Sequence, residues 1–151
     1  MTSTLLPARS RVASVPAAPA PLAARHFLAR LAFETDPSDL ASDLAAGVAG
    51  LVIVDTRAPE AYAAAHLPGA VNLPHATIDD ELAVGLDPNA LYVTYCWGPA
   101  CNASTKGAAA LASLGFQVKE LLGGLSAWQA EGFDVEGTDS TVTESGLACA
   151  C

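Results

Sequence analysis

Leu51-Val52-Ile53-Val54 is an unbroken apolar run whose side chains are mostly β-branched. Such a run is typical of a strand buried on both faces of a parallel sheet. A second run, Leu91-Tyr92-Val93-Thr94-Tyr95, has the same character and leads directly to Cys96. Shorter apolar runs predict further strands at residues 70–73 and 116–122.

Helices are predicted around these strands by apolar spacing and by capping residues. Thr35-Asp36-Pro37-Ser38 is an N-terminal capping signal for the helix that begins at Asp39, and Gly47 and Gly50 end that helix. The predicted helices cover residues 22–33, 39–46, 58–65, 77–84, 103–114 and 125–131. Because strands and helices alternate, the sequence predicts an α/β fold with a parallel sheet.

The chain of 151 residues has room for one compact domain, which we expect at residues 22–136. Residues 1–21 carry four prolines among small side chains and lack the apolar core of a secretory signal. We therefore expect a flexible leader there. Residues 137–151 are rich in Thr, Ser, Gly and acidic side chains, and we expect a flexible tail.

The composition excludes several classes of function. A net charge of −9 argues against nucleic-acid or acidic-membrane partners, which need clustered Lys and Arg. No stretch approaches the roughly 20 unbroken apolar residues of a membrane span. Four cysteines in two close pairs, Cys96 with Cys101 and Cys149 with Cys151, are typical of thiol chemistry in a reducing compartment. We therefore expect a cytoplasmic protein that handles small molecules or other proteins.

The candidate nucleophile is Cys96, at the end of the strand over residues 91–95. In open α/β sheets, ligands collect where a strand ends and the next helix presents its N-terminus. Amide N–H groups and the helix dipole then favour an anion, and they lower a cysteine pKa from about 8.5 into the range of about 3.5 to 7.5. The alternative interpretation is that Cys96 is a small buried apolar residue. The loop residues predicted to bind substrate are Trp97, Gly98, Pro99, Ala100, Cys101 and Asn102.

Four short segments occur in an informative order. Val54-Asp55-Thr56-Arg57 is a strand that ends in Asp-x-Arg, and His66-Leu67-Pro68-Gly69-Ala70-Val71-Asn72 follows it. Tyr95-Cys96 places a cysteine directly after a strand, and Gly123-Gly124-Leu125-Ser126-Ala127-Trp128 is a Gly-Gly-x-x-x-Trp segment. Through these four segments, residues 36–136 resemble a rhodanese domain of the single-domain sulfurtransferase type.

The resemblance implies a central five-stranded parallel sheet with helices on both faces. It also implies that Cys96 forms a persulfide from a donor such as thiosulfate and passes the sulfane sulfur to a thiol or protein acceptor. No cofactor is expected for that reaction. Asp55 and Arg57 carry over as structural residues that tie the strand to neighbouring loops by charged hydrogen bonds. His66 carries over as a turn residue rather than a catalytic base.

The loop after Cys96 is longer than is usual in single-domain members of this family. Rhodanese-fold phosphatases also have an enlarged loop, which supplies an Arg to pair with the oxyanion. This loop has no Arg, and the nearest cation is Lys106, one turn into the next helix. A thiol-dependent phosphatase or arsenate reductase is therefore the weaker enzyme interpretation. A non-catalytic binding or regulatory module is the main alternative, although the intact Cys96 favours an enzyme.

The remaining cysteines suggest a sulfur relay. Cys101 is near enough in sequence to reach Cys96 if the loop bends, and it would then resolve a persulfide into a disulfide and release hydrosulfide. The simpler interpretation is that Cys101 is a small buried residue. Cys149 and Cys151 are further relay candidates in the tail. The alternatives are that this pair binds a soft metal such as Zn or Cu(I), or that it has no function. No metal site is predicted, because two cysteines make a poor structural zinc site, which normally needs four ligands.

Overall fold

The computed structural model describes residues 10–139, which fall into two compact units that meet between Leu31 and Ala32. The first unit holds a short 3₁₀ turn, η1 (Val12–Ser14), and most of helix α1 (Ala20–Phe33). The helix predicted over residues 22–33 is thus confirmed. Within residues 10–139, no helix is long and apolar enough to span a lipid bilayer.

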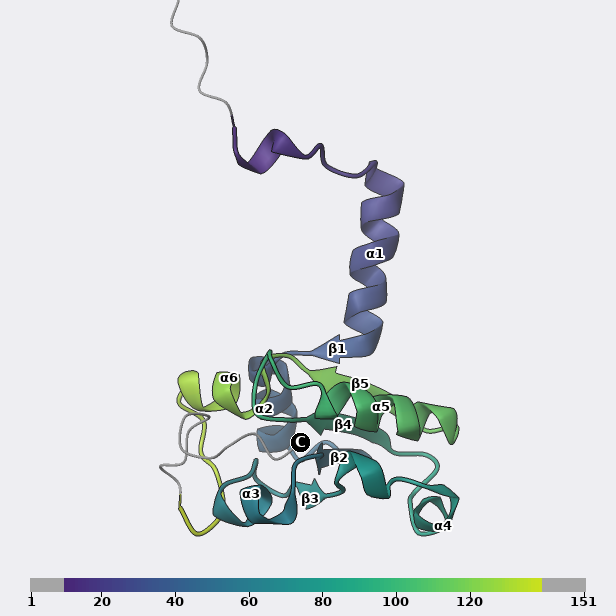
Figure 1. Cartoon of the computed structure of the whole chain (residues 1–151), viewed down its shortest axis with the longest axis vertical. Coiled ribbons are helices and arrows are strands. Elements are labelled where there is room, and N and C mark those ends of the chain that lie inside the picture. Colours follow the sequence, from purple (N-terminus) through teal and green to yellow (C-terminus); the bar gives the residue numbers. More distant parts are fainter. Residues whose placement is uncertain (1–9, 140–151) are drawn as a thin grey trace, which may run out of the picture. The chain divides into compact units, whose positions relative to one another are not determined.

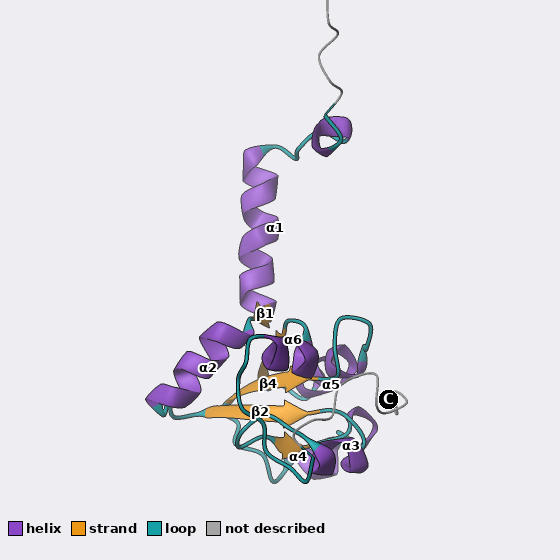
Figure 2. Cartoon of the chain, turned by 90° about the vertical axis from the view of Figure 1, so that its left-hand side faces the viewer, coloured by secondary structure: helices purple, strands orange, loops and turns teal. Residues whose placement is uncertain are grey.

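The second unit is built on a parallel sheet of five strands, in the order β1-β5-β4-β2-β3 (Figure 1). The strands are β1 (Glu34–Thr35), β2 (Leu51–Asp55), β3 (Val71–Asn72), β4 (Leu91–Tyr95) and β5 (Gln117–Leu121). Every neighbouring pair is parallel, and the arrows of β2 and β4 point the same way in Figure 2. The predicted fold class, an α/β fold with a five-stranded parallel sheet, is confirmed.

Helices cover both faces of this sheet. They are α2 (Pro37–Ala46), α3 (Pro59–Ala64), α4 (Asp80–Ala83), α5 (Ala103–Ser113) and α6 (Gly124–Ala130). Successive residues of β2 point to opposite faces, so Ile53 packs in a cluster with Leu40 of α2 and Trp128 of α6. Its neighbour Val54 packs in a second cluster with Leu111 of α5. The unbroken apolar run in β2 therefore contributes side chains to two hydrophobic clusters, one on each face of the sheet.

Two local predictions differ from the structure. Residues 77–84 do not form one helix, because a 3₁₀ turn, η2 (His75–Thr77), comes first and α4 begins only after Asp79. The Asp79 carboxylate accepts a hydrogen bond from the amide of Leu82 at 2.9 Å and so caps a new helix. The strand β1 was not predicted, because its two residues are polar and are extended only through their ladder with β5.

The chain end of the described region is held against α3. The amide of Thr138 donates to the carbonyl of Ala63 at 3.0 Å, and the amide of Asp139 donates to the carbonyl of Ala64 at 2.8 Å. The region for which we expected a flexible tail therefore begins with three residues, Gly137 to Asp139, that are attached to the second unit.

Candidate active site

The loop after β4 and the start of α5 enclose a cavity of about 290 Å³. The carboxyl ends of β4 and β5 meet here, as expected for parallel strands that are neighbours. Cys96 follows β4 directly and lines this cavity. Five of the six loop residues predicted to bind substrate also line it: Gly98, Pro99, Ala100, Cys101 and Asn102.

Cys96 and Cys101 are joined by a disulfide, and their Cα atoms are 6.2 Å apart. A turn brings the two residues together, in which the amide of Cys101 donates to the carbonyl of Gly98 at 3.1 Å. Cys96 is 1% exposed and Cys101 is 9% exposed, so both sulfur atoms belong to the interior of the loop. The structure thus shows the oxidised form of this cysteine pair.

Helix α6 holds the base of the loop through its first residues. The amide of Leu125 donates to the carbonyl of Cys96 at 2.9 Å, and the amide and hydroxyl of Ser126 both donate to the carbonyl of Trp97 at 2.8 Å. Gly124 lies so close that a Cβ there would collide with the carbonyl oxygen of Cys96, and its φ is +55°. Only glycine fits both conditions, which explains the second glycine of the Gly-Gly segment.

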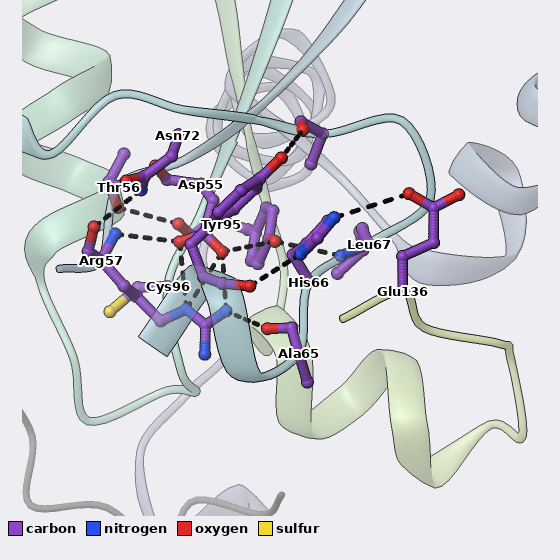
Figure 3. A network of polar contacts seen from close by, with 12 residues as sticks. Asp55, Thr56, Arg57, Ala65, His66, Leu67, Asn72, Tyr95, Cys96 and Glu136 are labelled. Atoms are coloured by element: carbon purple, nitrogen blue, oxygen red, sulfur yellow. Dashed lines mark hydrogen bonds and ion pairs between the residues drawn. The ribbon is translucent and has the colours of Figure 1, made fainter. Parts of the chain in front are cut away.

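A buried ion pair between Asp55 and Arg57 lies near Tyr95 and Cys96 (Figure 3). The Asp55 carboxylate accepts from Arg57 Nη2 at 2.6 Å and from Arg57 Nε at 3.0 Å, and both side chains are fully buried. Arg57 Nη2 also donates to the carbonyl of Ala65. Asn72 donates from Nδ2 to the carbonyls of Asp55 and Arg57, at 3.1 and 2.9 Å. The predicted structural role of Asp55 and Arg57, as charged links between a strand and its neighbouring loops, is confirmed.

Tyr95 extends this network to the end of β4. Its hydroxyl donates to Asp55 Oδ2 at 2.6 Å and accepts from the amide of Leu67 at 3.1 Å. Burial raises the pKa of Tyr95 well above its ordinary value of 10.0, and the negative charge of Asp55 raises this pKa further. Tyr95 therefore stays a neutral hydrogen-bond donor in the residue directly before Cys96.

His66 lies at the far side of the same network (Figure 3). Its Nδ1 is 2.7 Å from the carbonyl of Tyr62, its ring stacks on the Tyr62 ring, and its Nε2 is 3.5 Å from the Glu136 carboxylate. The backbones of His66 and Glu136 also pair as an antiparallel bridge. His66 does not line the cavity that Cys96 lines, so its contacts match the turn residue that we predicted.

Trp97 lies beneath the loop rather than in the wall of the cavity. Its side chain is 1% exposed, and the guanidinium of Arg57 lies 4.2 Å from the centroid of its ring. Of the loop residues predicted to bind substrate, Trp97 is thus the one that the structure directs away from the cavity and into the core. The positively charged Arg57 supports the loop from below through this aromatic contact.

Comparison with known proteins identifies the family of this arrangement. The model of the rhodanese-like domain matches residues 36–131. The chain belongs to the rhodanese-like domain family. The resemblance seen in the sequence is thereby confirmed.

Several individual relatives of this rhodanese-like domain are also known. A thiosulfate sulfurtransferase, GlpE, of Pseudomonas entomophila is 38% identical over 88 residues, which are 57% of this chain and 77% of that protein. The HTH-type transcriptional regulator Rv0324 of Mycobacterium tuberculosis is 35% identical over 86 residues, and the match spans only 38% of its length. The crystal structure of the BH2092 protein of Bacillus halodurans superposes with a TM-score of 0.76 at 41% identity, covering 83% of this chain and 95% of that one.

Four polar residues in the cavity of this rhodanese-like domain were not predicted. Glu120, from β5, accepts hydrogen bonds from the hydroxyls of Ser104 at 2.6 Å and Thr105 at 2.9 Å. Glu34 of β1 lines the cavity as well. A polar residue in a short strand is usually predicted to face solvent. The pairing of β5 with β4 instead places Glu120 in the same cavity as Cys96 and Cys101. Lys106, the nearest cation in the sequence, is exposed and is not part of the lining.

The remaining relay candidates, Cys149 and Cys151, lie outside the described residues. Their proposed role in sulfur transfer stays a prediction. Within residues 10–139, no group of three or more His, Cys, Asp or Glu side chains is arranged to hold a metal ion.

Proposed function

We propose that this rhodanese-like domain is a sulfurtransferase that carries sulfane sulfur on Cys96, from a small donor such as thiosulfate to a thiol or protein acceptor. The observation that carries the proposal is the position of Cys96, at the carboxyl end of β4 and in the lining of a cavity beside the first turn of α5. The relative GlpE, itself a thiosulfate sulfurtransferase, supports the same reaction class.

The reaction has two steps, and the first requires a free thiolate. In the reduced form of the pair, the Cys96 thiolate attacks the outer sulfur of thiosulfate, a new S–S bond forms, and sulfite leaves with the electron pair of the broken bond. The product is a Cys96 persulfide anion. In the second step the nucleophilic acceptor attacks the terminal sulfur, and the Cys96 thiolate is the leaving group.

The protein stabilises these anions mainly through backbone groups. Ser104 and Thr105 line the cavity from the first turn of α5, an eleven-residue helix that begins at Ala103. The N-terminal end of such a helix carries a partial positive charge, which favours a thiolate or persulfide near it. We therefore assign the anion-stabilising role to the start of α5 rather than to a cationic side chain.

The disulfide between Cys96 and Cys101 must be reduced before the first step, because a disulfide sulfur is not a nucleophile. The proposal therefore includes a reducing compartment, the cytoplasm, as the place where the enzyme is active. It predicts no turnover by the oxidised protein and recovery of activity after treatment with a dithiol.

The test is a sulfur-transfer assay on protein that has been reduced and freed of reductant. Thiocyanate formation from thiosulfate and cyanide measures turnover, and intact-protein mass after thiosulfate alone measures sulfur loading. We expect turnover in the wild type and in Ala109→Ser, a control at an exposed position of α5 outside the cavity lining, and none in Cys96→Ser. Turnover by a correctly folded Cys96→Ser variant would overturn the assignment of Cys96.

One observation favours a second candidate function, a non-catalytic regulatory module. The chain matches part of Rv0324, an HTH-type transcriptional regulator, and spans 38% of its length. A reduced wild-type protein that gains no sulfur from thiosulfate or an organic persulfide, releases no hydrosulfide and forms no thiocyanate with cyanide would favour this module over the enzyme.

A further inference from the structure

The loop between Cys96 and Cys101 must bend sharply to bring the two cysteines together. Five residues of extended backbone reach about 16 Å, at about 3.3 Å per residue. The Cα atoms of Cys96 and Cys101 are only 6.2 Å apart, which lies in the range that a disulfide needs. The loop therefore folds back on itself and presents the second cysteine to the first.

Rigid elements hold both ends of this bend. Cys96 follows β4, and its carbonyl is bonded to the amide of Leu125 in α6. Cys101 is closed into a turn by its bond to Gly98 and lies two residues before Ala103, where α5 begins. The two sulfur atoms are thus positioned by a strand end on one side and a helix start on the other. This arrangement does not depend on a long flexible segment.

Both cysteines also line the same cavity. Each lines the cavity in which a sulfur donor would reach Cys96, and each is almost fully shielded from bulk solvent. A sulfur atom loaded onto Cys96 is therefore placed next to the thiol of Cys101. An external acceptor, in contrast, must enter the cavity before it can react.

We infer that Cys101 is a resolving residue, which attacks the persulfide on Cys96 and releases hydrosulfide. The inference rests on the proposed function, since it needs the Cys96 persulfide as its substrate. The Cys101 sulfur attacks the inner sulfur of that persulfide and forms the Cys96–Cys101 disulfide. The bond between the inner and outer sulfur breaks, and the outer sulfur leaves with the electron pair and takes up the proton of the Cys101 thiol.

The disulfide in the structure joins the same two sulfur atoms that this step would join. To return to the reduced form, the pair requires a dithiol reductant, which is oxidised to its own disulfide by thiol–disulfide exchange. Over one cycle, thiosulfate and a dithiol are converted to sulfite, hydrosulfide and an oxidised dithiol. The domain then acts as a dithiol-dependent sulfane-sulfur reductase in addition to transferring sulfur to external nucleophiles.

A single-turnover experiment tests this inference. Fully reduced protein, freed of reductant, is mixed with one equivalent of thiosulfate and no acceptor, and hydrosulfide and intact protein mass are followed. The wild type is expected to release about one equivalent of hydrosulfide and to end two hydrogen atoms lighter, with a Cys96–Cys101 disulfide in its peptide map. Cys101→Ser is expected to keep the mass of one added sulfur and to release hydrosulfide at least about 100-fold more slowly, because a thiol already held against its target has a high effective molarity.

Two controls separate this inference from the proposed function. Cys101→Ser should still form thiocyanate when cyanide is added, whereas failure of Cys101→Ser and wild type alike to take up sulfur would overturn both proposals. The double variant Cys149→Ser, Cys151→Ser should release hydrosulfide like the wild type, at a rate constant independent of protein concentration. Cys101→Ala is the second variant if Cys101→Ser does not fold. A stable wild-type persulfide, or hydrosulfide release from a folded Cys101 variant at the wild-type rate, would overturn the role of Cys101 and leave the proposed function standing.

Discussion

The guanidinium of Arg57 lies over the indole of Trp97, 4.2 Å from the ring centroid, and both side chains are buried. This contact joins the segment after β2 to the loop after β4. The charge of Arg57 is balanced by Asp55, whose carboxylate binds its Nε and Nη2 atoms. The Asp-x-Arg segment therefore acts on the candidate active site from below, by supporting the residue that follows Cys96.

Replacement of Arg57 by Lys should destabilise the domain by about 1–3 kcal/mol, because Asp55 and the carbonyl of Ala65 lose buried hydrogen-bond donors. Lys keeps the charge but lacks the planar fork that binds Asp55 and stacks on Trp97. The free energy of unfolding in urea measures the effect. Arg25→Lys, at an exposed position of α1, is the matched control and should change stability little. Equal stability of the two variants would contradict the structural role of Arg57.

Replacement of Tyr95 by Phe should cost about 1–3 kcal/mol, because Asp55 Oδ2 loses a donor and the amide of Leu67 loses an acceptor. The wild type should also show a pH dependence that the variant lacks. Because the folded pKa of Tyr95 is raised above 10.0, the unfolded chain ionises first. The stability from this group is complete below pH 10 and is lost as the pH rises toward the folded pKa. Denaturation curves between pH 8 and pH 11 measure both effects. If wild type and Tyr95→Phe lose the same stability as the pH rises, the pH dependence does not come from Tyr95.

Replacement of Gly124 by Ala should disturb the loop as well as the fold. The new Cβ collides with the carbonyl oxygen of Cys96, at a residue whose φ is positive. Gly132 is a matched control, since its φ is +83° and a Cβ there meets nothing within 4 Å. We expect a loss of about 1–2 kcal/mol for Gly132→Ala, from backbone strain alone. Gly124→Ala should lose up to about 3 kcal/mol more and most of its thiocyanate formation per folded molecule. Equal activity in both variants would show that Gly124 does not position Cys96.

The fold was predicted well where burial leaves a strong sequence pattern. β2 and β4 are buried against two cores, so their runs are unbroken and their bounds agree with prediction to within one residue. β1 gave no such signal, because Glu34 and Thr35 are extended only through pairing with β5. The helix expected at residues 77–84 was wrong for a local reason, the cap formed by Asp79.

The order of strands and helices along the chain was enough to predict the position of Cys96. Residues whose position depends on contacts with distant parts of the chain were not predicted correctly. Cys96 follows a strong strand, so its place at the sheet edge could be read from the sequence. The burial of Trp97 could not, because it depends on Arg57, forty residues earlier in the chain. Glu120 was missed for a related reason, since its position in the cavity depends on the register of β5 against β4. Distant pairing of this kind leaves no periodic pattern in one sequence.

Replacement of Glu120 by Gln should improve the use of an anionic donor. The Glu120 carboxylate lines the cavity and repels thiosulfate, while a Gln side chain keeps an oxygen that accepts from Ser104 and Thr105. Removal of one charge near an anion changes its binding by about 1 kcal/mol or less, so kcat/KM for thiosulfate should rise about two- to fivefold at low salt. At an ionic strength of about 1 M the gain should largely disappear, because charges are then screened over about 3 Å. Glu131→Gln, an exposed carboxylate outside the cavity lining, should show no gain at either salt concentration. If Glu120→Gln matches the wild type at low and high salt alike, the anionic donor does not bind in this cavity.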